Sequence, residues 1–162
     1  MMPDSQLVNS QSTVTLREVT AKTVRDICRL SDTLSPAQQR MVASNAVSIA
    51  EAHFSDYAWF RAIYAGETPV GFIMLYIGPD DDEPEKTIYF LWRLMIASPF
   101  QGFGFGKQAL QIVIPDIKAQ GAKVLFTSCG QGEGSPESFY RKLGFIPTGE
   151  MSGSEMVLKL DL

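Results

Sequence analysis

Apolar and polar residues alternate in several short stretches of the chain, which is the pattern of strands that bury one face. The pattern predicts seven strands, at residues 13–19, 58–65, 70–77, 87–97, 123–129, 145–150 and 154–160. The stretch 87–97 is apolar on both faces, as expected of a strand in the middle of a sheet. The short connection at residues 66–69 predicts that the second and third strands form an antiparallel hairpin.

Between these strands the apolar residues recur at helical spacing. They predict helices at about residues 20–30, from Pro36 onward, at 46–54, at about 104–120 and at 135–143. Pro36 suits the first position of a helix, and Pro115 predicts a kink. Strands and helices mixed in this way predict a single α/β domain over residues 13–162. Residues 1–12 are polar and aperiodic and predict a flexible tail.

The composition narrows the class of protein. A chain of 162 residues with 45% hydrophobic and 20% charged residues is typical of one globular domain. Its net charge of −4 disfavours nucleic acid as a partner and is compatible with a small cationic substrate. The two cysteines, Cys28 and Cys129, lack metal-ligand or redox spacing, so we expect free thiols and no metal. With no apolar run of membrane-spanning length and no signal-peptide pattern, we expect a cytoplasmic protein without a membrane partner.

The most informative motif is the stretch Gln101-Gly102-Phe103-Gly104-Phe105-Gly106-Lys107, called the glycine loop below. Glycine accepts positive φ, so such a loop can turn its N–H groups toward an anion. A helix that begins here would point its free N–H groups and its positive dipole end the same way. The loop therefore predicts a phosphate-binding site. The dinucleotide pattern fails at Lys107, and the P-loop pattern fails at Gln101 and Gln108.

The spacing of Gln101, Gly104 and Gly106 fits the Q/R-x-x-G-x-G/A loop that binds pyrophosphate in the GCN5-related N-acetyltransferases, and the chain resembles this superfamily. Residues 135–145 resemble its second signature, a helix that ends in F-Y-x-K-L-G-F. The order of predicted elements over residues 13–162 is also similar. The resemblance implies a mixed, mostly antiparallel seven-stranded sheet that splays between its fourth and fifth strands, with helices on both faces.

The resemblance also implies acetyl-CoA as co-substrate and direct transfer of acetyl to an amine. Tyr140 matches the superfamily tyrosine that protonates the departing thiolate, whose pKa of about 8.5 lies below the value of about 10 for a phenol. A backbone N–H at a bulge of the fourth strand is expected to face the thioester oxygen. The residues assigned to acetyl-CoA are Leu94, Met95, Ile96, Gln101, Gly102, Phe103, Gly104, Phe105, Gly106, Lys107, Thr127 and Ser128.

The general base is left open, because the fourth strand carries no carboxylate between residues 88 and 94. Glu51, Tyr89 and a chain of water molecules are the alternatives. The acidic stretch at residues 80–85 is expected to be a solvated loop.

The acceptor rests on a finer resemblance. Residues 34–52 are similar to the Q-x-x-F-V-A-x-N-x-x-S-L-A-E-A stretch of bacterial spermine/spermidine (diamine) acetyltransferases, with Met41 in place of the usual Phe. A polyamine is therefore the expected acceptor, and the residues assigned to it are Asn45, Glu51, Tyr89 and Trp92. Asn45 has a helix N-cap as its alternative role, Glu51 a surface position, and Trp92 core packing.

Two other functions remain open at this point. One is acetylation of a protein or peptide amine, and the other is a non-catalytic acyl-CoA-binding regulatory module. Superfamily members often pair through their late strands, so a homodimer is a further expectation.

Overall fold

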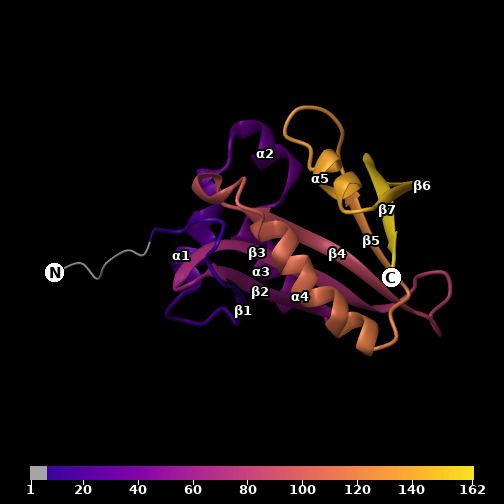
Figure 1. Ribbon diagram of the computed structural model, residues 1–162. Coiled ribbons are helices and arrows are strands. Elements are labelled where there is room, and N and C mark those ends of the chain that lie inside the picture. The colour runs from indigo at the N-terminus through magenta and orange to yellow at the C-terminus, as the bar shows by residue number, and fades with distance from the viewer. Residues whose placement is uncertain (1–6) are drawn as a thin grey trace.

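The computed structural model describes residues 7–162 and contains one seven-stranded sheet in the order β1-β2-β3-β4-β5-β7-β6 (Figure 1). The strands are β1 (Val14–Arg17), β2 (Ala58–Ala65), β3 (Thr68–Pro79), β4 (Thr87–Ile96), β5 (Val124–Cys129), β6 (Ile146–Ser152) and β7 (Glu155–Asp161). The α-helices are α1 (Val24–Arg29), α2 (Pro36–Met41), α3 (Asn45–His53), α4 (Phe105–Ala119) and α5 (Glu137–Lys142), with 3-10 turns η1 (Leu30–Thr33) and η2 (Ser98–Phe100).

The predicted fold class is confirmed, and the differences lie at the ends of elements. The first helix begins at Val24 rather than near Thr20, because Thr23 is its N-cap and residues 20–23 form a turn. Helix α4 continues through Pro115 to Ala119. Residues 1–6 of the predicted tail lie outside the described residues, and within residues 7–12 Val8 packs against the core.

The two faces of the sheet carry separate cores. Along β3, Phe72 and Met74 pack with the side chains of α1, whereas Ile73 and Leu75 pack with those of α4. This alternation is the period-two pattern of a strand covered on both faces. Helix α4 crosses the front of the sheet in Figure 1. No helix among residues 7–162 combines the length and apolar character needed to cross a membrane.

The sheet opens between β4 and β5. All neighbouring strands are antiparallel except these two, which are parallel and pair only at Phe90 with Phe126 and at Leu91 with Thr127. The Thr127 hydroxyl donates a hydrogen bond of 3.0 Å to the Leu91 carbonyl, the last point at which the two strands meet. Beyond it, among the described residues, β4 pairs with β3 alone, and its backbone groups on the β5 side form an open edge, where the Ile96 carbonyl accepts from the Gln101 side chain.

The fourth strand carries a bulge next to this opening. Met74 of β3 pairs with Arg93, and Leu75 pairs with Leu91, so Trp92 is an extra residue on β4. A bulge leaves its extra residue out of the ladder and re-aims the neighbouring groups. The expected bulge of the fourth strand thus lies one residue beyond the point where β5 separates.

Candidate active site

The glycine loop connects the end of β4 to the start of α4. Gly102 has φ +87° and Gly104 has φ +83°, and a Cβ at either position would meet no atom within 4 Å. The requirement for glycine is therefore conformational, since residues other than glycine rarely adopt such backbone angles. Gly104 is the N-cap of α4, and no side chain caps that end. The N–H groups of the first turn of α4 consequently lack partners within the helix and face out of its positive end.

A third glycine allows two helices to approach closely. A Cβ on Gly106 would lie 3.1 Å from the ring of Phe139, which belongs to α5. Gly106 is buried inside the first turn of α4. Contact through Gly106 therefore brings the start of α5, and with it Tyr140, next to the glycine loop.

A cavity of about 440 Å³, called the loop cavity, lies against the glycine loop. Its walls are the last residues of β4, the glycine loop, α2 and the start of α5. The predicted cofactor residues that line it are Leu94, Met95, Ile96, Gln101, Gly102, Gly104, Phe105 and Gly106. Phe103 packs against the core and Lys107 is exposed, so neither side chain forms its wall.

A second cavity of about 310 Å³, called the gap cavity, lies over the opening between β4 and β5. Thr127 and Ser128 line it from β5, and Trp92 and Arg93 line it from the bulge of β4. Tyr140 lines both cavities and therefore stands at their junction.

Tyr140 is held rigidly and kept from water. Its side chain is only 4% exposed, and its ring lies 5.3 Å from those of both Phe139 and Phe145. Burial raises the pKa of the Tyr140 phenol above its ordinary value. The hydroxyl is therefore protonated at neutral pH and is available as a proton donor in this cavity.

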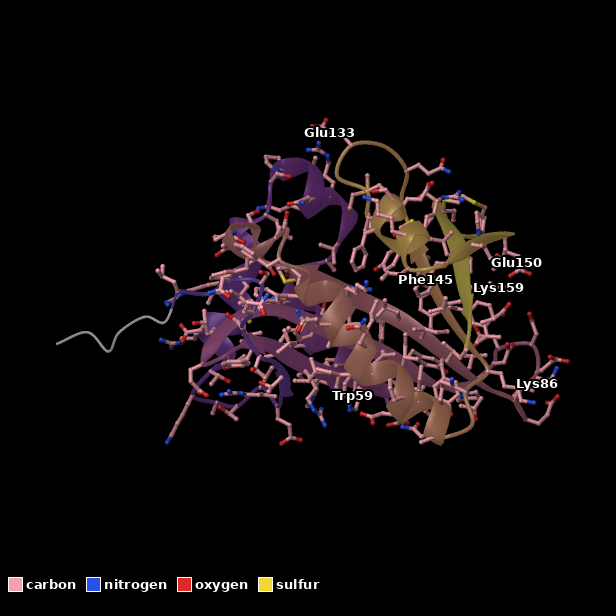
Figure 2. The ribbon with its side chains drawn as sticks, viewed as in Figure 1. Trp59, Lys86, Glu133, Phe145, Glu150 and Lys159 are labelled. Carbon is pink, nitrogen blue, oxygen red and sulfur yellow. The ribbon has the colours of Figure 1, made fainter. Side chains whose placement is uncertain are left out.

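The short helix α2 forms a wall of both cavities and is attached at two points. A Cβ on Gly134 would lie 2.6 Å from the carbonyl carbon of Ala37, so the β5–α5 loop packs directly on the α2 backbone. The Gln38 amide donates to the Gln101 side chain at 3.2 Å, and the Gln101 amide donates to the Ile96 carbonyl at 2.9 Å. Glu133 of the β5–α5 loop points outward beside α2 (Figure 2).

Three of the four residues predicted to bind the amine lie away from the cavities. Asn45 is 1% exposed, and its N–H and side-chain amide donate to Ser31 and to the Ile27 carbonyl, both at 2.8 Å. The helix N-cap is Ser44 instead, whose hydroxyl accepts from the Val47 N–H. Asn45 therefore fastens α3 to α1.

Glu51 and Tyr89 are also engaged elsewhere. Glu51 forms an ion pair of 3.3 Å with Arg93 and lines neither cavity. Tyr89 is buried, and its hydroxyl donates to the Gln120 carbonyl at 3.4 Å, near the opposite end of β4. The acidic loop lies at that end too, where Lys86 projects outward (Figure 2). Trp92 is the one of these four residues, all of them described, that lines the gap cavity.

The gap cavity also contains charged residues that the sequence pattern did not reveal. Glu155 at the start of β7 accepts a hydrogen bond of 3.1 Å from the Ser128 hydroxyl. Arg40 and Arg93 line the same cavity. Glu155 comes to the opening only because β7 pairs with β5, a contact between distant parts of the chain that leaves no local signal. Within residues 7–162, no three His, Cys, Asp or Glu side chains gather as a metal site.

Comparison with known proteins agrees with this geometry. The sequence model of the acetyltransferase (GNAT) family matches residues 26–145, and no curated protein sequence matches the chain. An acetyltransferase from Thermus thermophilus superposes with a TM-score of 0.74 at 20% identity, covering 93% of this chain and 97% of that one.

Two further solved structures share the fold. The PaiA N-acetyltransferase of Thermoplasma acidophilum in complex with coenzyme A has a TM-score of 0.65 at 18% identity, covering 93% of this chain and 99% of that one. Naa50 of Arabidopsis thaliana, in complex with the bisubstrate analogue CoA-Ac-MVNAL, has a TM-score of 0.63 at 20% identity, covering 92% and 99%. The family match spans most of the sheet and both signature segments. The chain belongs to the GNAT family of acetyltransferases.

Proposed function

We propose that the protein transfers the acetyl group of acetyl-CoA to a primary amine, with donor and acceptor bound together. The observation that carries this proposal is the position of Tyr140, a buried and protonated phenol at the junction of the loop cavity and the gap cavity. Two cavities that meet at a proton donor suit a reaction between two bound substrates.

The loop cavity suits the donor. The N–H groups of the glycine loop and of the first turn of α4 would hold the pyrophosphate, because N–H groups without helical partners at a helix N-terminus attract anions. The open edge of β4 at Leu94, Met95 and Ile96 offers backbone hydrogen bonds to the two amides of the pantetheine arm, except at the Ile96 carbonyl, which already accepts from Gln101. The family relative from Thermoplasma acidophilum, solved with coenzyme A, supports this assignment.

The chemistry requires one bond to form and one to break. The amine nitrogen bonds to the thioester carbonyl carbon, and the carbon–sulfur bond breaks. A backbone N–H at the Trp92 bulge stabilises the negative charge on the carbonyl oxygen. Tyr140 donates its proton to the sulfur that leaves.

A polyamine is the first acceptor to test, on the sequence resemblance of residues 34–52. In the gap cavity, however, a polyamine would meet two arginines, Arg40 and Arg93, and a single carboxylate among the described lining residues, that of Glu155. This charge pattern favours a second candidate, the amine of a peptide or protein. The relative from Arabidopsis thaliana, solved with CoA-Ac-MVNAL, supports the second candidate.

The test is release of free thiol from acetyl-CoA in the presence of spermidine, spermine, putrescine, aminoglycosides and peptides with free N-termini. Turnover with the polyamines supports the first acceptor, and turnover with the peptides supports the second. Tight binding of coenzyme A without thiol release from any amine would instead indicate a non-catalytic acyl-CoA-binding regulatory module.

We also propose that the protein acts in the cytoplasm as a homodimer. Strand β6 lies at the edge of the sheet and exposes Ile146 and Met151, which suits pairing with a second copy. Light scattering coupled to size-exclusion chromatography distinguishes the dimer from the monomer.

A further inference from the structure

An amine substrate must lose protons before and during acetyl transfer, and the site needs a group that accepts them. Most primary amines are protonated at neutral pH, and the ammonium form cannot attack a carbonyl. Strand β4 carries no carboxylate from Thr87 to Ile96. Glu51, a candidate on sequence grounds, is paired with Arg93 and lines neither cavity. A side chain that accepts the proton therefore has to come from another element.

Glu155 is the one carboxylate among the described residues that line the gap cavity. In the β5–β7 pairing, Ser128 lies opposite Val157, and Glu155 is two residues from Val157 on the same face of the sheet. Ser128 is thus within reach and donates its hydroxyl hydrogen bond to Glu155 at 3.1 Å. The hydrogen bond fixes the carboxylate at the mouth of the opening that Tyr140 lines from α5.

Resting on the acetyltransferase function proposed above, we propose that Glu155 binds the ammonium group of the acceptor and accepts its proton, with Ser128 holding the carboxylate in position. The titratable and charged groups that line the gap cavity with Glu155 are Tyr140 on α5, Arg93 on β4 and Arg40 on α2. The Cys129 thiol lies near them on the opposite face of β5. None of them competes for the ammonium, because burial keeps Tyr140 and Cys129 neutral and the arginines are cations. An ammonium that enters this cavity meets its only negative partner among the described residues at Glu155.

The proton balance closes without a further reactant. The substrate ammonium gives one proton to Glu155, which passes it to solvent, and the neutral nitrogen attacks the thioester. The sulfur takes the Tyr140 proton as the carbon–sulfur bond breaks. The nitrogen then loses its second proton, which restores the Tyr140 hydroxyl. The products are the amide, free coenzyme A and one released proton.

The experiment compares Glu155→Gln with the native protein across the whole amine panel, as thiol release at pH 7 and at rising pH. Glu155→Gln keeps the size of the side chain but removes its charge. Rates should fall about 10²- to 10³-fold at pH 7 for every amine that the native protein acetylates. The deficit should narrow toward pH 10, where the amines lose their proton in solution without help. Coenzyme A affinity should not change, because Glu155 lines the gap cavity and not the loop cavity.

Two further variants sharpen the test. Glu150→Gln removes a charge from an exposed residue of β6 that lines neither cavity, and it should retain native rates (Figure 2). Ser128→Ala leaves the carboxylate in place but loses its hydrogen bond, so it should show a smaller deficit with the same dependence on pH.

Three results separate the ideas. If the native protein releases no thiol with any amine, the acetyltransferase proposal fails. If Glu155→Gln acetylates as fast as the native protein, the role of Glu155 is refuted while the acetyltransferase proposal stands. A deficit that is equal at every pH would show a structural role only and would also overturn the proposal.

Discussion

Replacing Tyr140 with Phe removes one oxygen atom from the junction of the two cavities and leaves the ring in place. The ring keeps its contacts with Phe139 and Phe145, whose centroids lie 5.3 Å away. The lost group is a single buried hydroxyl, so the free energy of unfolding should change by about 1 kcal/mol or less. The change therefore tests chemistry rather than packing.

The expected loss of turnover is much larger than the loss of stability. A positioned general acid contributes about 10²- to 10⁴-fold to a rate, which corresponds to about 2.7–5.4 kcal/mol of transition-state stabilisation. Because Tyr140, in the proposed mechanism, donates to the sulfur only as the sulfur leaves, kcat should carry this loss, and the affinity for coenzyme A should stay at its native value.

The dependence on pH gives the reasoning a second check. Burial raises the pKa of Tyr140, so ionisation of this phenol should cause no fall in rate up to pH 10. The deficit of Tyr140→Phe should be greatest below about pH 8.5, where the free thiol is the stable form of the leaving group, and should shrink above it.

The pH dependence of stability reports the same pKa shift of Tyr140 independently of the enzyme's turnover. A raised pKa in the folded state stabilises the native protein fully below the unfolded value of about 10, and this contribution is lost as the pH rises further. In thermal melts above pH 10, the Tm of the native protein should therefore fall more than the Tm of Tyr140→Phe. Initial rates from thiol release, coenzyme A titrations and melts are the measurements. Turnover at the native rate, with correct folding, would refute the assignment of Tyr140 as the acid.

The other predictions concern the loops that shape the cavities. Gly134→Ala should lower the free energy of unfolding through left-handed strain of about 1–2 kcal/mol and overpacking against Ala37 of about 1–3 kcal/mol, measured as a lower Tm. Gly104→Ala adds only the strain, but it disturbs the N-cap of α4 and should weaken coenzyme A binding about tenfold, a change of about 1.4 kcal/mol. Gln38→Ala breaks the link to Gln101 and should raise KM for acetyl-CoA with little effect on kcat.

Matched variants control each of these changes. Gly132 lies in the same loop as Gly134 with φ +103° and open space around its Cβ, so Gly132→Ala should destabilise less. Gly149 has φ +87°, close to that of Gly104, but lies in β6, so Gly149→Ala should leave coenzyme A affinity unchanged. Gln39→Ala should keep the native KM for acetyl-CoA, because the Gln39 side chain donates to the Leu34 carbonyl and lines only the gap cavity of the two. Equal effects within any pair would contradict the corresponding argument.

The sequence predicted the class of fold and contained the motif behind the proposed donor site, because both depend on local patterns. Strand alternation, helix spacing and the positive φ of Gly102 and Gly104 are properties of short segments. The glycine loop and the segment around Tyr140 are each continuous in sequence, so the roles proposed for them could be inferred from their resemblance to family motifs before the structure was known. Their meeting at Gly106 and Phe139 required only that the two helices pack together.

The lining of the gap cavity, where we propose that the acceptor binds, was decided by tertiary structure. Asn45 and Glu51 belong to a stretch that resembles a family motif. Packing, however, places the Asn45 side chain in the interface between α1 and α3 and pairs Glu51 with Arg93. Glu155 lies in an unremarkable stretch and reaches the opening through the pairing of β7 with β5. A charge in a cavity depends on which distant strands become neighbours, and hydrophobic periodicity specifies only which face of each strand is buried. The amino-acid sequence thus determined the sheet and the glycine loop, and the order of the strands determined which charged groups line the gap cavity.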